Sequence, residues 1–208
     1  MSKINRPGFP NSNGSTDFVE LYAGIGYVVS KWEHLMTRVF ALHSQLSTGD
    51  MVSNLPTYSS LGNSRQQMSA TQNVIDFRLN EFQNARSADR PCTLALTEEL
   101  KRRNKSMFGR ISNFAKKRNK VVHGQIQNGR FTKNENGKTT EYSGLYVTSS
   151  LYSQTQLNLW DGKDYFYSGK ELFDIGSNLE TCRSDFNQLG DDVLRFLREI
   201  DGKAAVAW

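Results

Sequence analysis

The chain has 208 residues, 37% of them hydrophobic, and carries 26 Lys and Arg against 21 Asp and Glu, a net charge of +5. This length predicts a single domain, and the two cysteines, Cys92 and Cys182, exclude a disulfide scaffold and a four-cysteine zinc site. No apolar run approaches about 18 residues, and residues 1–15 lack the apolar core of a signal peptide, so we expect a cytoplasmic protein with no membrane partner.

Four stretches of the chain have apolar residues at three- and four-residue spacing, which predicts four amphipathic helices. Before them, residues 1–15 read as a flexible leader, and after them, residues 202–208 read as a tail. A single helical domain is expected over 16–201. The first predicted helix runs from Thr16 or Ser15 to about Gly49, and the second from Arg65 to Ala85. The third runs from Thr93 or Thr97 to His123, and the fourth from Gly169 to Ile200.

Glycines add detail to these helices. Gly24 and Gly26 inside the first helix predict that another element approaches closely there, because glycine in a helix interior is otherwise destabilising. Gly124 directly follows the third helix, where glycine suits the left-handed conformation. Residues 49–63, rich in Gly, Ser and Asn, read as a loop.

The pattern changes between the third and fourth predicted helices, over about residues 125–168. Turn signals at Gly129, Asn134–Gly137 and Asp161–Lys163 separate runs rich in Tyr, Thr, Leu and Phe. These runs predict strands over 126–132, 139–148, 154–160 and 164–168, with a hairpin at Asp161-Gly162. The predicted fold class is therefore mainly α: an up-and-down four-helix bundle with a small β-strand insertion between the third and fourth helices.

Charge is unevenly distributed along the chain. The segment 101–120 contains no acid, whereas 171–201 holds eight acids against three basic residues. A basic segment of this kind is compatible with a polyanionic partner, and also with a solvated helix face. The basic residues of the segment are Lys101, Arg102, Arg103, Lys105, Arg110, Lys116, Lys117, Arg118 and Lys120.

Few residues in the chain could carry chemistry. His34 and His43 lie nine residues apart on the first predicted helix and so on opposite sides, which excludes a metal pair and favours structural roles. Asn119 and His123 lie four residues apart and share one face at the end of the third helix. By helical phase, Arg118 falls on the apolar side, with Leu100, Ile111 and Val122.

A charged residue on an apolar side requires a partner or an interface. Alternatively, Arg118 and His123 serve only to satisfy the last carbonyls of the helix. The residues themselves leave both interpretations open.

The end of the third predicted helix resembles the Arg-polar-x-x-x-His signature of the HEPN superfamily. The residues that carry this resemblance are Arg118-Asn119, then Lys120-Val121-Val122, then His123-Gly124. In that family the signature ends the third helix of a four-helix bundle, and the helix order predicted here is similar over about residues 16–200. Some family toxins carry a tyrosine two residues after the histidine, a site of inactivating modification. The corresponding residue in this chain is Gln125.

The resemblance implies a metal-independent endoribonuclease that uses no cofactor and works as a homodimer, with the two motifs facing each other in a basic cleft. His123 would be general base or acid for attack of the ribose 2′-OH on the adjacent phosphate, and Arg118 would stabilise the developing charge. Asn119 would orient the phosphate or His123. Such an enzyme would be a prokaryotic toxin or defence effector, with an antitoxin or defence protein as a further partner.

Several other residues would complete an RNA-binding surface. Glu33, on the first predicted helix, is a candidate accessory residue, although an exposed flanking role is the simpler interpretation. Aromatic residues of the β insertion could stack RNA bases or form the core of a small sheet. These are Tyr142, Tyr146, Tyr152, Trp160, Tyr165 and Tyr167. The predicted phosphate contacts are Lys116, Lys117 and Lys120 beside the motif, and Arg102, Arg103 and Lys105 earlier on the helix.

Two alternatives compete with a ribonuclease. One is a non-catalytic HEPN module that dimerises or binds RNA as an adaptor. The other is a basic helical DNA-binding domain, although the sequence shows no helix-turn-helix spacing with a short glycine turn.

Overall fold

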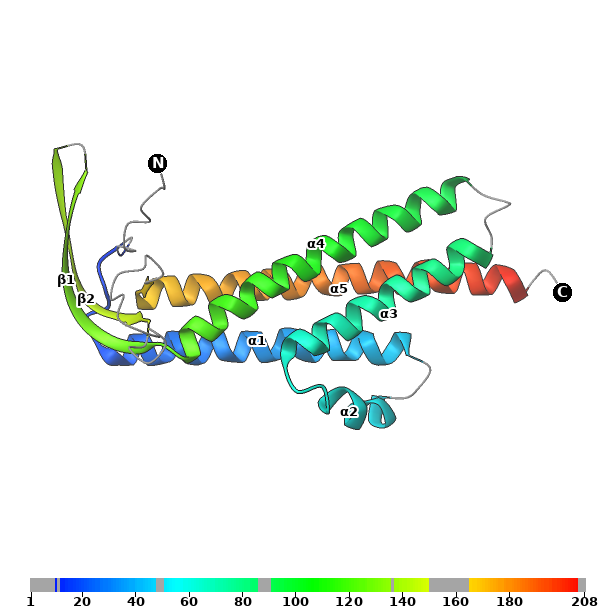
Figure 1. Ribbon diagram of the computed structural model, residues 1–208, viewed down its shortest axis with the longest axis horizontal. Coiled ribbons are helices and arrows are strands. Elements are labelled where there is room, and N and C mark those ends of the chain that lie inside the picture. The colour runs from blue at the N-terminus through cyan, green and yellow to red at the C-terminus, as the bar shows by residue number, and fades with distance from the viewer. Residues whose placement is uncertain are drawn as a thin grey trace, which may run out of the picture. The chain divides into compact units, whose positions relative to one another are not determined.

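The structure is a computed structural model that describes residue 10 and residues 12–47, 51–85, 91–135, 137–149 and 165–205. These residues form mainly helices together with a small antiparallel sheet (Figure 1). The helices are α1 (Phe18–Leu46), α2 (Met51–Ser59), α3 (Ser64–Ala85), α4 (Pro91–Val122) and α5 (Gly169–Ala205), and the strands are β1 (Gln125–Glu135), β2 (Lys138–Thr148) and β3 (Phe166–Tyr167).

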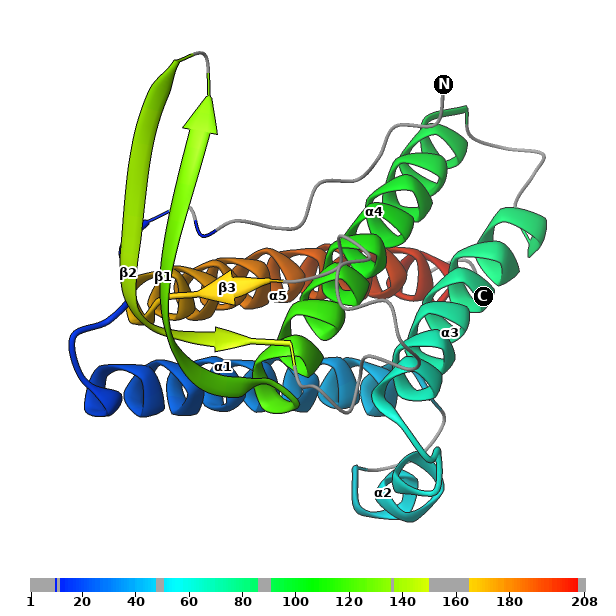
Figure 2. The ribbon, with the colours of Figure 1, turned by 60° about the vertical axis from the view of Figure 1, so that its left-hand side comes forward.

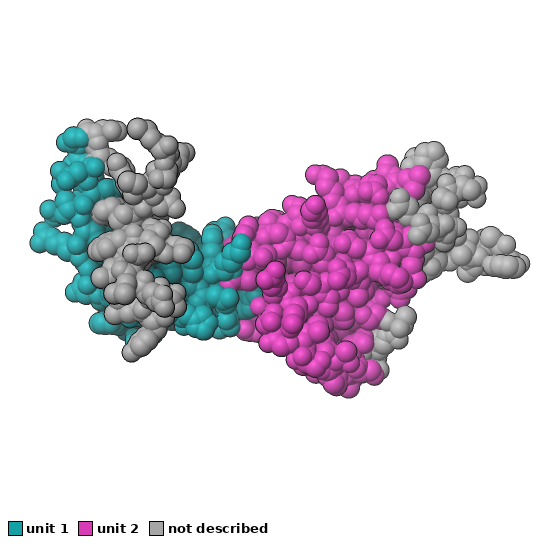
Figure 3. Space-filling view, viewed as in Figure 1, with its two compact units in different colours: residues 1–32, 116–179 teal, residues 33–115, 180–208 magenta. Residues whose placement is uncertain are grey.

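The chain divides into two compact units, coloured separately in Figure 3. Unit 1 comprises residues 1–32 and 116–179, and unit 2 comprises residues 33–115 and 180–208. Helices α1, α4 and α5 therefore contribute residues to both units.

The sheet of unit 1 has the strand order β1-β2-β3 (Figure 2). β1 and β2 form a long hairpin paired from Gln125↔Thr148 to Glu135↔Lys138, and β3 pairs with the end of β2. The turn predicted at Asn134–Gly137 is confirmed. The turn predicted at Gly129 is wrong, because Gly129 lies inside β1 opposite Gly144, where the ring of Phe131 covers it. The predicted strand 154–160 and the hairpin at 161–162 lie outside the described residues.

The sheet contributes buried residues of β2 to the core of unit 1: Leu145, Tyr146 and Val147. Tyr146 is fully buried, its hydroxyl donates to the Ser12 carbonyl at 3.0 Å, and its ring meets those of Phe131 and Phe166 edge-on. Tyr146 therefore belongs to the core of a small sheet and cannot stack RNA bases. Residues 12–15, at the end of the predicted leader, hydrogen-bond to β2: Ser15 N–H donates to the Leu145 carbonyl at 2.9 Å.

Glycines mark close approaches within unit 1. A Cβ on Gly24 would lie 2.8 Å from Leu172 Cβ, which confirms the predicted approach of another element, here α5. Among the described residues the same prediction is wrong for Gly26, because a Cβ there would meet none of their atoms within 4 Å.

Replacing Gly144 with alanine tests the most constrained of these glycines. Gly144 has φ +129°, and an added Cβ would lie 2.8–2.9 Å from backbone atoms of Gly14. We expect the free energy of unfolding to fall by about 2–4 kcal/mol, since a strained conformation and overpacking both contribute. Gly137→Ala is the control. Gly137 also has positive φ (+76°), but nothing lies within 4 Å, so the loss should be only about 1 kcal/mol. Equal losses in urea titrations would contradict the role of the Gly14 contact.

In unit 2, α1, α3, α4 and α5 supply buried residues such as Leu35, Ile75, Ile111 and Leu189. Side-chain contacts join these helices. Phe108 of α4 meets Phe186 of α5 edge-on at 5.9 Å, and Arg78 of α3 donates to the Leu46 carbonyl of α1 at 2.9 Å. Buried Asn104 of α4 donates to Asp76 of α3 at 2.8 Å.

The loop predicted over 49–63 is wrong for residues 51–59, which form α2. Tyr58 of α2 is buried and its ring lies 4.9 Å from both Phe40 and His43 of α1. The burial of this tyrosine outweighs the low helix propensity of Pro56, which lies inside α2.

Helix ends follow local chemistry. Glu171 and Ser168 bond reciprocally at the start of α5, as in a capping box: Ser168 N–H donates to Glu171 Oε2 at 2.9 Å, and Glu171 N–H to Ser168 Oγ at 3.3 Å. α1 is capped by Asp17 rather than by Ser15 or Thr16, because Asp17 Oδ1 accepts from Glu20 N–H at 2.9 Å.

Two helices are longer than predicted. α4 begins earlier than predicted, at Pro91, since proline is well suited to the first helical position. α5 runs on to Ala205, into the predicted tail.

Candidate functional site

Arg118, Asn119 and His123 lie in and directly after the last turn of α4, in unit 1. His123 N–H donates to the Asn119 carbonyl at 3.0 Å, which continues the helical hydrogen bonding past Val122. Arg118 Nη1 donates to Asn119 Oδ1 at 3.3 Å. The side chains of Asn119 and His123 are exposed and that of Arg118 is half-buried. The motif is thus gathered at one helix end, with its imidazole open to a ligand.

The partial burial of Arg118 follows from its phase on α4. Ile111, one heptad earlier, is fully buried, and Val121, three residues later, is 2% exposed. The predicted apolar side included Val122, and this is wrong, because Val122 is 38% exposed. Arg118 therefore lies on the buried side of α4, and its long side chain can extend the guanidinium towards the surface.

Gly124 makes the junction between α4 and β1 possible. A Cβ there would lie 2.5 Å from Val147 Cγ1 and 2.8 Å from the Lys120 carbonyl oxygen. The predicted left-handed conformation is wrong, since the positive φ values of the described glycines belong to Gly137 and Gly144. Glycine stands after His123 because β2 packs against the helix end.

Tyr165 contacts the same helix end. Its hydroxyl donates to the Lys120 carbonyl at 2.6 Å, and the Lys120 ammonium lies 5.1 Å from the centre of its ring. Burial, and secondarily the neighbouring Tyr167, raises the pKa of Tyr165 to about 12. From the sequence, Tyr165 is only one of several aromatic candidates for base stacking or for the core of a sheet. The aromatic run 164–168 gave no signal for its partner, which lies 45 residues away.

The basic segment is more compensated than its sequence indicates. Two arginines of α4 pair with acids of α5, Arg103 with Asp192 and Arg110 with Asp185, each at 2.8 Å. The hydrogen bond from Arg103 holds the pKa of Asp192 below its usual value. Within α4, Lys101 pairs with Glu98 at 3.0 Å and Arg102 with Glu99 at 2.8 Å. Four of the nine basic residues of this segment are therefore paired with acids in the folded chain.

The predicted phosphate contacts fall into two groups. Lys116, Lys117 and Lys120 are exposed and belong to unit 1, together with the motif. Arg102, Arg103 and Lys105 belong to unit 2. Of these, Arg102 and Arg103 line a cleft of about 310 Å³, where both are already bonded to carboxylates. Arg102 and Arg103 are thus weaker candidates for phosphate contacts than Lys116, which is exposed and lies near the motif.

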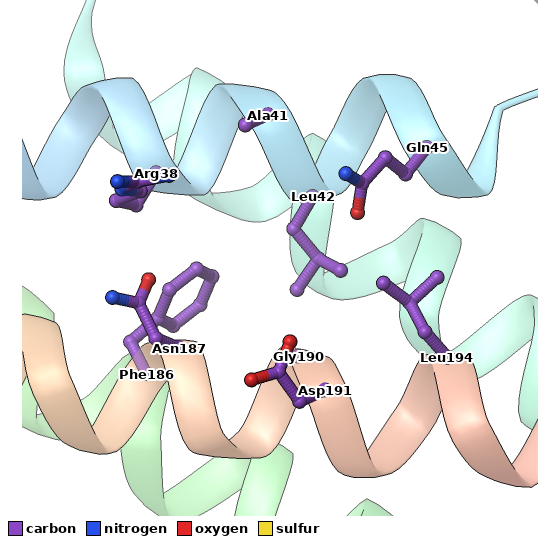
Figure 4. A pocket seen from close by; sticks show the side chains of 9 residues that line it. All are labelled: Arg38, Ala41, Leu42, Gln45, Phe186, Asn187, Gly190, Asp191 and Leu194. Atoms are coloured by element: carbon purple, nitrogen blue, oxygen red, sulfur yellow. The ribbon is translucent and has the colours of Figure 1, made fainter.

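A second cleft in unit 2, of about 250 Å³, lies between α1 and α5 (Figure 4). Polar side chains from both helices border it, Arg38 and Gln45 from α1 and Asn187 and Asp191 from α5. One guanidinium and one carboxylate balance each other, so the lining does not select for the phosphates of RNA.

The remaining candidates have structural settings. Glu33 is exposed on α1 in unit 2, and its carbonyl accepts from Thr37 Oγ1 at 2.9 Å. His34 is exposed, and His43 packs against Tyr58, with its pKa lowered by burial. Over the described residues there is no group of three or more His, Cys, Asp or Glu side chains able to hold a metal ion. In that same part of the chain, no helix is both long enough and apolar enough to span a bilayer.

Comparison with known family models, with curated proteins and with solved structures gives no match for this chain.

Proposed function

We propose that the protein is a metal-independent endoribonuclease of HEPN type, a prokaryotic toxin or defence effector. The observation that carries this proposal is the meeting of Arg118, Asn119 and His123 at one helix end, with the imidazole exposed and the guanidinium in contact with the amide. The proposal includes a finer fold, in which α1, α3, α4 and α5 are the four members of an up-and-down bundle. It also includes a homodimer with the motif at the interface, and an antitoxin or defence protein as a further partner.

Each residue of the motif has a chemical role in the proposed reaction. His123 accepts the proton of a ribose 2′-OH, whose oxygen attacks the adjacent phosphorus. Arg118 stabilises the charge that develops on the phosphoryl oxygens, and Asn119 orients the phosphate or the imidazole. The P–O5′ bond breaks, and the leaving oxygen takes up a proton from an imidazolium, which in the dimer belongs to the second copy. The products are a 2′,3′-cyclic phosphate and a 5′-OH, and DNA is excluded because it lacks the attacking hydroxyl.

The reaction needs no metal, which makes EDTA the most direct test. Purified protein incubated with total RNA in EDTA should cleave it to fragments with 2′,3′-cyclic phosphate ends. Cleavage that requires Mg²⁺ would reject this mechanism. RNA binding without cleavage would instead support the adaptor alternative.

Binding of RNA should depend on the exposed lysines beside the motif. In a plot of the logarithm of the RNA association constant against the logarithm of the salt concentration, the line falls with a slope set by the number of phosphate contacts. Replacing Lys116 with glutamine should make this slope less steep by about 1, since one phosphate contact is lost. Arg110→Gln is a control with the same change in net charge. Arg110 is already paired with Asp185, so this substitution should leave the slope nearly unchanged. Equal changes in the two variants, measured by fluorescence anisotropy between about 50 and 200 mM salt, would show that net charge alone acts.

A further inference from the structure

The end of α4 leaves backbone carbonyls that the helix itself cannot satisfy. The Asn119 carbonyl accepts from His123 N–H at 3.0 Å. The Lys120 carbonyl, one residue later, accepts from the Tyr165 hydroxyl at 2.6 Å. A side chain from the segment that enters β3 thus supplies a hydrogen bond to the turn that carries the motif.

The same tyrosine also contacts the side chain of Lys120. The ammonium lies 5.1 Å from the centre of the ring, within the range of a cation–π contact. One aromatic residue therefore holds Lys120 at both its backbone and its side chain. Lys120 lies three residues before His123, and positions three apart share a helix face.

Tyr165 is itself held in place by the sheet. The next residue, Phe166, pairs with Thr148 of β2, and its ring packs at 4.7 Å from Phe131. The Tyr167 ring lies 5.2 Å from that of Tyr165. With its pKa raised to about 12, the phenol stays protonated and remains a hydrogen-bond donor throughout the physiological pH range.

We propose that Tyr165 is a positioning residue that locks the last turn of α4, so that Lys120 and His123 meet the RNA in a fixed arrangement. This inference rests on the ribonuclease proposed above. It assigns a role to the end of the β insertion, which delivers Tyr165 to the helix end.

Two substitutions at Tyr165 separate its hydroxyl from its ring. Tyr165→Phe removes the bond to the Lys120 carbonyl and keeps the ring beneath the ammonium. We expect kcat for RNA cleavage to fall roughly 10- to 100-fold with KM little changed, because small misplacements of reacting groups have effects of this size. Tyr165→Leu removes the ring as well, so KM should also rise.

Tyr167→Phe is the matched control, since it deletes the same atom two residues away. Tyr167 is half-buried, and its ring stays beside that of Tyr165 in this variant. Its kcat should stay close to that of the wild type, because the bond from Tyr165 to the Lys120 carbonyl remains. A fall in kcat of the same size in Tyr167→Phe would overturn the specific role of Tyr165.

Amide hydrogen exchange of the free protein tests, without any RNA, whether Tyr165 locks the last turn of α4. The His123 amide should exchange roughly tenfold faster in Tyr165→Phe than in the wild type, since the turn can open more easily. An unchanged rate would overturn the lock, whether or not the protein cleaves RNA. Faster exchange with unaltered kcat would overturn the positioning role. A wild type that shows the lock but does not cleave RNA would instead reject the ribonuclease, and the positioning role with it.

Discussion

Replacing His123 with alanine is expected to lower the rate of RNA cleavage by about 10²–10⁴-fold, the usual size of a lost proton transfer. The folded state should be almost unaffected, because the imidazole is exposed and the backbone N–H that bonds to the Asn119 carbonyl remains. The measurement is single-turnover cleavage of a labelled RNA in EDTA, with thermal unfolding followed in parallel.

His34→Ala is the control for this substitution, since His34 is also exposed but lies on α1 in unit 2. It should cleave RNA at the wild-type rate. Equal cleavage by wild type and His123→Ala would show that the imidazole has no part in the reaction. The proposed mechanism would then be rejected.

Replacing Arg118 with alanine is expected to reduce kcat/KM by about 10²–10³-fold, the order found when one group that stabilises transition-state charge is removed. Arg118 is half-buried and contacts Asn119, so its loss should also loosen the amide that orients the phosphate. Arg118→Lys keeps the charge but not the planar fork, and it should recover only part of the activity. Arg110→Ala, which removes an arginine paired with Asp185, should retain wild-type kinetics.

The same variant bears on the proposed dimer. If Arg118 lies at an interface between two copies, light scattering should show a dimer for the wild type at tens of micromolar and a larger monomer fraction for Arg118→Ala. A wild type that is monomeric under these conditions would contradict a site shared between two copies. Arg118→Ala with full activity would contradict the role of the guanidinium.

The elements that sequence reasoning located depend on interactions close together in the chain. The apolar spacing of α1, α3, α4 and α5 is a local pattern with a helical period, and it is visible without knowledge of any partner. The turn at Asn134–Gly137 is likewise local, because a glycine with positive φ supplies it. The motif at the end of α4 is contiguous, so its members were bound to lie together once the helix was recognised.

Tertiary structure decided the features whose partners lie far apart in the sequence. Helix α2 forms around the burial of Tyr58 against α1, and Gly129 continues a strand because Gly144 faces it and Phe131 covers it. The charge of the basic segment is reduced by Asp185 and Asp192, which lie more than seventy residues away. Local propensities of about 1 kcal/mol or less cannot anticipate such contacts, since burial and pairing across the fold outweigh them. For the same reason the sequence alone determined which residues form the motif, and only the folded chain placed Tyr165 against the turn that carries it.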